Sequence, residues 1–194
     1  DNPSASNKPN AIKLPSINTS DLKLRDLRSL RQADHVYCGS KAANLGQINA
    51  NIKTANVPDG FCIPFGYYQQ FLQQLGIDSA YLQHMEASFQ GNNRARRAGL
   101  LALQEKIQAA PVPQAWQDAW GAQWQNQLQG LGVFVRSSSN SEDLPNFSGA
   151  GLYTTVPNVR SGTDLAAAVR KVWASVYNFE AWEARQAAGI DDAQ

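Results

Sequence analysis

A large apolar side chain recurs every four residues between Gln114 and Gln129, at Trp116, Trp120, Trp124 and Leu128. This spacing places the four side chains on one face of an α-helix. A tryptophan stripe could stack against a ligand, but packing of the helix against a sheet is the simpler explanation. We therefore expect a helix whose tryptophans are mostly buried.

The residues after this helix predict a strand. Gly130 and Gly132 end the helical pattern, and Val133-Phe134-Val135 is a short, wholly apolar run typical of a buried strand. Leu152–Val159 is a second strand candidate, with Pro157 marking an edge or an end. Periodic apolar residues predict further helices over 39–52, 65–75, 79–89, 93–110, 163–177 and 180–188, and short strands within 22–30 and at 61–63. The sequence thus predicts an α+β domain with a small mixed sheet flanked by several helices.

The composition excludes several classes of protein. The chain has 194 residues, 43% of them hydrophobic, which is too apolar for a disordered chain. It has no run of 18 apolar residues, so we expect no membrane span. A formal charge of +1 provides no general attraction to nucleic acid or to anionic lipid.

The ends of the chain suggest a piece of a longer protein. Residues 1–15 are rich in Asn, Ser and Pro, which is linker composition, and Met85 is the only methionine. We expect residues 1–20 to be a linker or tail and residues 21–194 to be part of a larger domain. Either a signal peptide has been removed or the segment was cut from a longer polypeptide.

Cys38 and Cys62 are the only cysteines, and no second Cys or His pair accompanies them in a zinc-site spacing. Two free, partly buried thiols are favoured over a disulfide.

Three segments could bind an anion. The first, Gly39-Ser40-Lys41, places a lysine at a predicted helix start, where unpaired N–H groups attract phosphate, although a solvent-facing lysine is the simpler interpretation. In the second, Arg136 leaves the predicted strand and is followed by Ser137, Ser138, Ser139 and Asn140. An arginine beyond a strand end can clamp phosphate, but it could also pair with Glu142 and Asp143.

The third segment is the glycine-rich loop Ser148-Gly149-Ala150-Gly151, before the strand that carries Thr154 and Thr155. Its backbone could approach an anion closely, or it could be an ordinary hairpin. Together the three segments suit a polyphosphate. Apart from Glu142-Asp143, no acidic pair is placed to hold the Mg²⁺ that nucleotide phosphoryl transfer requires.

Four ordered motifs resemble the nucleotide-binding N-terminal domain of the pyruvate phosphate dikinase and phosphoenolpyruvate synthase family, which glucan water dikinases and rifampin phosphotransferase share. They are GSKAANLGQI, VPDGFCIPFGYYQQFL, VFVRSSSNSEDLPNFSGAGLYTTVPNV and DLAAAVRKVWASVY. The resemblance covers roughly residues 22–189. It implies the first lobe of an ATP-grasp-like domain, with ATP held between two lobes.

The resemblance also implies roles for individual residues. Lys41 and Arg136 match the family's phosphate-binding lysine and arginine, and are the expected catalytic residues. Gly39 and Ser40 accompany Lys41, and the expected covering loop and strand comprise Ser148, Gly149, Ala150, Gly151 and Thr155. Two positions depart from the family pattern, because Ser40 replaces a usual glycine and Thr154 stands where the family often has aspartate.

The resemblance also implies domains that this sequence does not contain. The resemblance implies a downstream second lobe with the Mg²⁺ ligands, and a swivelling domain whose histidine accepts the phosphoryl group of ATP. His35 and His84 lie in unrelated contexts and are not expected to be that acceptor. We expect an ATP-binding lobe that is inactive by itself and, because it uses ATP, cytoplasmic. The alternatives are a catalytically inactive nucleotide sensor and a protein-interaction module that uses exposed tryptophans.

Overall fold

The computed structural model describes residues 14–141, 143–144, 147–148 and 151–190. The helices of these residues are α1 (His35–Asn51), α2 (Phe65–Gln74), α3 (Ser79–Ser88), α4 (Asn93–Ala109), α5 (Gln114–Leu128), α6 (Gly162–Ala174) and α7 (Phe179–Ala187), with 3₁₀ turns η1 (Leu27–Ser29), η2 (Gln32–Asp34) and η3 (Ser175–Tyr177). The strands are β1 (Arg25–Asp26), β2 (Phe61–Cys62), β3 (Val133–Arg136), β4 (Asp143–Leu144), β5 (Phe147–Ser148) and β6 (Thr155–Val159). The predicted α+β class is confirmed.

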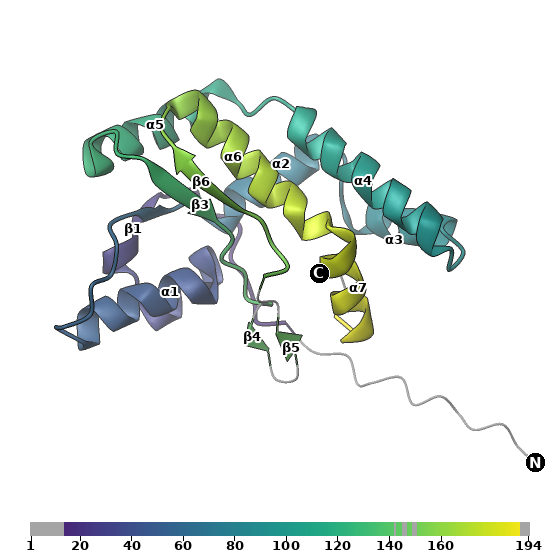
Figure 1. The fold of residues 1–194 in the computed structure, drawn as a ribbon, viewed down its shortest axis with the longest axis horizontal. Coiled ribbons are helices and arrows are strands. Elements are labelled where there is room, and N and C mark those ends of the chain that lie inside the picture. The colour runs from purple at the N-terminus through teal and green to yellow at the C-terminus, as the bar shows by residue number, and fades with distance from the viewer. Residues whose placement is uncertain (1–13, 142, 145–146, 149–150, 191–194) are drawn as a thin grey trace, which may run out of the picture.

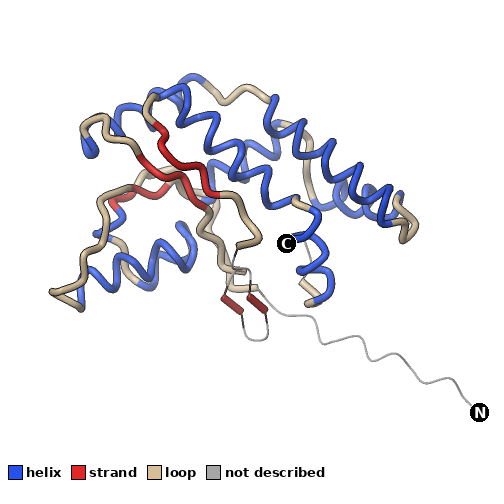
Figure 2. The backbone as a smooth tube through the Cα atoms, in the orientation of Figure 1, coloured by secondary structure: helices blue, strands red, loops and turns tan. Residues whose placement is uncertain are grey.

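The described strands pair two by two, all antiparallel: β1 with β2, β3 with β6, and β4 with β5. This differs from the small mixed sheet that the sequence suggested. The strands of each pair are short, so helices rather than a broad sheet dominate the architecture (Figure 2). The β3–β6 pair lies along α6, while α1 and β1 lie apart from the large helical layer (Figure 1).

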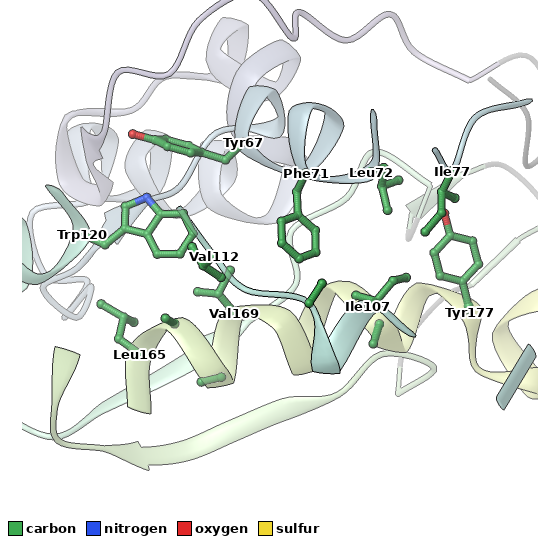
Figure 3. Close-up of a cluster of buried hydrophobic side chains, with 14 of the residues drawn as sticks. Tyr67, Phe71, Leu72, Ile77, Ile107, Val112, Trp120, Leu165, Val169 and Tyr177 are labelled. Atoms are coloured by element: carbon green, nitrogen blue, oxygen red, sulfur yellow. The ribbon is translucent and has the colours of Figure 1, made fainter. Parts of the chain in front are cut away.

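The main core lies between helices α2, α4, α5 and α6 and contains the predicted tryptophan stripe. Trp120 is fully buried, and its ring lies beside that of Tyr67 at a centroid distance of 5.3 Å (Figure 3). The Trp120 ring also contacts that of Trp173 at 5.9 Å. Trp124 is also buried, and its indole N–H donates to the carbonyl oxygen of Leu131 at 2.9 Å. The stripe therefore serves packing, as expected, although its ring partners come from helices.

The prediction of a buried strand at 133–135 is correct for only one face. Val133 and Val135 pack against the main core, whereas the side chain of Phe134 is 69% exposed. Successive strand residues point to opposite faces, and nothing in the described part of the chain covers the outer one. Phe134, Arg136 and Thr155 are therefore exposed residues on one short antiparallel ladder.

A second, smaller apolar cluster lies under α1 and comprises Leu30, Cys38, Ala42 and Cys62, with Leu27 and Tyr37 at its edge. Here the structure corrects the expectation of free thiols. Cys38 and Cys62 form a disulfide, with their Cα atoms 6.0 Å apart. Their spacing of 24 residues could not indicate this, because the approach of β2 to α1 depends on the tertiary fold.

No helix in the described ranges is long and apolar enough to cross a bilayer.

Candidate phosphate-binding site

Gly39 interrupts α1 and sets the position of the predicted phosphate-binding lysine. Its φ of +78° and ψ of 162° are not helical, so a new helical stretch begins directly after it. Glycine adopts a positive φ without the steric cost that other residues meet. Lys41 consequently lies in the first turn of this second stretch, where backbone N–H groups lack helical partners and favour anions.

The loop after β3 holds this turn in place through side chains and backbone. The hydroxyl of Ser138 accepts a hydrogen bond from the backbone N–H of Ala42 at 2.9 Å. The hydroxyl of Ser40 donates to the amide oxygen of Asn140 at 3.0 Å, and the amide nitrogen of Asn140 donates to the carbonyl oxygen of His35 at 3.0 Å. Asn140 is 8% exposed, so it joins the two halves of α1 from a buried position.

Lys41 contacts the backbone beside Arg136 at this junction. The Lys41 ammonium donates to the carbonyl oxygen of Ser137 at 3.3 Å, and Ser137 is the residue directly after Arg136. Arg136 is exposed at the end of β3 and pairs across the ladder with Thr155. The half-buried Lys41 therefore contacts the backbone directly next to the exposed Arg136, although 95 positions separate the two residues.

The structure describes only some of the other predicted site residues. Gly149 and Ala150 lie outside the described residues, as does Glu142, a suggested partner of Arg136. Ser148 ends strand β5. Gly151 is exposed, with a φ of +78°, in the turn that leads to Thr155. Thr154, the departure from the family pattern, has its backbone N–H hydrogen-bonded to the hydroxyl of Ser175 at 3.0 Å.

Two contributions to this site were not anticipated. The side chains of Ser138 and Asn140, which follow Arg136 in the sequence, hold the turn at Gly39–Ala42 and the start of α1. Cys38, directly before Gly39, anchors the same turn to β2 through the disulfide. The adjacency of Cys38 to the Gly-Ser-Lys motif was the signal in the sequence that could have drawn attention to it.

The described residues contain no group of three or more His, Cys, Asp or Glu side chains placed to hold a metal ion. Lys41 and Arg136 carry positive charge and hydrogen-bond donors, which are the groups that an anion site needs. Arg136 offers a planar guanidinium suited to bidentate phosphate contact, and Lys41 offers a compact charge.

Comparison with known proteins finds similarity over most of the chain. Residues 35–194 match the family model described as pyruvate phosphate dikinase, AMP/ATP-binding domain. The chain is 27% identical to a rifampicin phosphotransferase of Streptomyces sp over 86% of its length, and 31% identical to the phosphoenolpyruvate synthase of Pseudomonas aeruginosa, also over 86%. It is 32% identical to the phosphoenolpyruvate synthase of Synechocystis sp. over 79% of its length. It spans 19% to 21% of the length of these three relatives.

Proposed function

Because this chain belongs to the pyruvate phosphate dikinase AMP/ATP-binding domain family, we propose that it binds the β- and γ-phosphates of ATP between Lys41 and Arg136. The observation that carries the proposal is the contact between the Lys41 ammonium and the carbonyl oxygen of Ser137, beside Arg136. It supports the proposal because it anchors the Lys41 charge at the residue next to Arg136. An ATP-binding domain needs positive charge at such a point, because the triphosphate carries most of the charge of its ligand.

The two cations suit different tasks. Lys41 is half-buried and tethered, so its charge stays in one place without rearrangement when an anion arrives. Arg136 is exposed at the end of β3, and its guanidinium has the planar shape for bidentate contact with phosphate. The backbone N–H groups that follow Gly39 add donors at the start of the second helical stretch.

In the complete protein we propose that this lobe takes part in phosphoryl transfer from ATP, as the names of the relatives indicate for them. When bound, ATP supplies the phosphoryl group, and Lys41 and Arg136 would stabilise the negative charge that develops on its oxygens. We assign the Mg²⁺ ligands and the accepting histidine to other parts of the polypeptide. The backbone around Gly151 would close over the phosphates and exclude water.

Different observations bear on the two alternative functions. Trp120 and Trp124 are buried and Trp116 is partly buried against the main core, which argues against an interaction module that uses exposed tryptophans. A catalytically inactive nucleotide sensor would use the same ATP contacts as the enzyme, so binding alone does not separate them. Turnover by the complete protein does, because a sensor binds ATP and transfers nothing.

Calorimetric titration of the 194-residue chain with ATP tests the binding claim. Lys41→Ala and Arg136→Ala should each weaken ATP affinity by roughly tenfold to a hundredfold, the range expected when a charged hydrogen-bonding partner is lost. Exposed cations elsewhere provide matched controls. Lys53 lies beyond the end of α1, and Arg160 lies beyond the far end of β6. The variants Lys53→Ala and Arg160→Ala should therefore bind ATP with the original affinity.

The same substitutions in the complete protein test the catalytic claim. Each should lower ATP-dependent turnover by orders of magnitude while the protein stays folded. We also propose that the 194-residue chain alone binds ATP weakly and transfers no phosphoryl group. Wild-type turnover in either complete variant would refute the assigned roles.

A further inference from the structure

The disulfide lies directly beside the proposed phosphate site. Cys38 precedes Gly39, and Cys62 ends strand β2, which pairs with β1. Both cysteines are nearly fully buried, at 3% and 7% exposure. A covalent bond therefore joins the break in α1 to strand β2. This attachment is separate from the loop that follows β3, which contacts the same break.

The Gly39–Ala42 turn is consequently held from two sides. On one side are the hydrogen bonds from Ser40, Lys41 and Ala42 to residues 137–140. On the other side lie the disulfide and the small apolar cluster under α1, which is separate from the main core. A cluster of so few side chains gives little resistance to local opening, so the covalent bond is the strong restraint on that side.

We propose that the Cys38–Cys62 disulfide is a positioning element for the phosphate site, and that its reduction loosens the Lys41 turn without unfolding the main core. The idea rests on the proposed function, because it concerns how tightly the same site binds ATP. Neither cysteine would touch the nucleotide. They act through Gly39, which must keep its positive φ for Lys41 to reach the loop at 137–140.

The redox step is a thiol–disulfide exchange. A dithiol reductant donates two electrons and two protons, the Cys38–Cys62 bond breaks into two thiols, and the reductant becomes a cyclic disulfide. Disulfides persist in oxidising compartments and are rare where cellular thiols stay reduced. The compartment would therefore set the affinity of this site, and the cytoplasm expected from ATP use would favour the looser, reduced form.

Titration of the oxidised and the dithiothreitol-reduced chain with ATP is the first arm of the test. Reduction should weaken ATP affinity by at least about tenfold, and the Cys38→Ser/Cys62→Ser variant should bind as weakly as the reduced chain. The serine variant should not respond to dithiothreitol, which controls for effects of the reductant itself. Equal affinity of the oxidised and reduced chains would overturn the proposal.

Amide hydrogen exchange is the second arm and separates local positioning from general stability. On reduction, the N–H of Ala42, which the Ser138 hydroxyl protects, should exchange at least about tenfold faster. The amides of Trp120 and Val169 in the main core should keep their exchange rates. Faster exchange throughout the core would mean that the disulfide supports the whole fold, and would contradict a positioning role.

The two arms also distinguish this inference from the proposed function. If neither form binds ATP, the proposed function fails, and the exchange of Ala42 still decides whether the disulfide positions the turn. An Ala42 amide that is unaffected by reduction would refute the inference even if ATP binds.

Discussion

A Cβ atom at position 39 would lie 1.8 Å from the carbonyl oxygen of Ser138. Gly39 and Ser138 are therefore in direct backbone contact, at the place where α1 breaks and the loop after β3 passes it. Only a residue without a side chain permits this approach, and the positive φ of Gly39 restricts the position in the same way. The proposed phosphate site depends on this contact, because Lys41 follows two residues later.

Substitution Gly39→Ala tests that dependence. The new methyl group should force the turn and the loop apart, lower the free energy of unfolding by about 2–4 kcal/mol, and abolish measurable ATP binding. Urea unfolding and an ATP titration would measure the two effects.

Gly76→Ala provides the matched control. Gly76 also has a positive φ, of +65°, but a Cβ there would meet nothing within 4 Å. It should show only the conformational cost, about 1–2 kcal/mol, with ATP affinity unchanged. Equal effects of the two substitutions on ATP binding would contradict the importance of the Gly39–Ser138 contact.

Asn140→Ala should destabilise the same junction from the other side. It removes the partner of both the Ser40 hydroxyl and the His35 carbonyl oxygen in a buried setting. Leaving such groups unpaired typically costs about 1–3 kcal/mol, measurable by urea unfolding. ATP affinity should fall as well. Asn49→Ala, whose amide makes one exposed hydrogen bond to the Arg28 carbonyl, should change stability by less than about 0.5 kcal/mol.

Trp120→Ala and Phe134→Ala should differ sharply although both remove a large aromatic ring. Trp120 is fully buried among rings of α2 and α6, so its loss should cost about 3–5 kcal/mol. Phe134 is 69% exposed, so its loss should cost no more than about 0.5 kcal/mol. A costly Phe134→Ala substitution in urea unfolding would show that the outer face of β3 is covered in solution.

The pH dependence of stability should include a contribution from Asp59. A hydrogen bond from the side chain of Gln127, together with the Gly60 backbone N–H and the charge of Arg28, lowers the pKa of Asp59 below its ordinary value of 3.8. A carboxyl group with a lowered pKa stabilises the fold above the ordinary pKa, and this contribution is lost as the pH falls through the folded-state pKa.

Asp59→Asn should therefore be less stable than the original chain at pH 7, and the difference should shrink as the pH drops from about 4 to about 2. Urea unfolding at a series of pH values would measure it. A stability difference that stays constant over this range would mean that the ionised carboxylate contributes nothing.

The sequence predicted the helices well because their apolar residues recur with helical spacing, as at Trp116, Trp120 and Trp124. It also identified Lys41 and Arg136 as candidates through their motifs. It did not predict the exposed face of β3, because the run Val133-Phe134-Val135 is apolar throughout, and exposure of Phe134 depends on what packs against each face. The disulfide was missed for a related reason, since contact between Cys38 and Cys62 depends on how β2 folds back onto α1.

The central claim is that Lys41 and Arg136 belong to one site that binds the phosphates of ATP. An ATP titration of the isotopically labelled chain, followed by amide chemical shifts in NMR spectra, tests it most directly. The amides of residues 40–42 and 136–138 should shift together along one binding curve, while those around Arg160 should not move. Shifts confined to only one of these two segments, or lying elsewhere on the molecule, would contradict it.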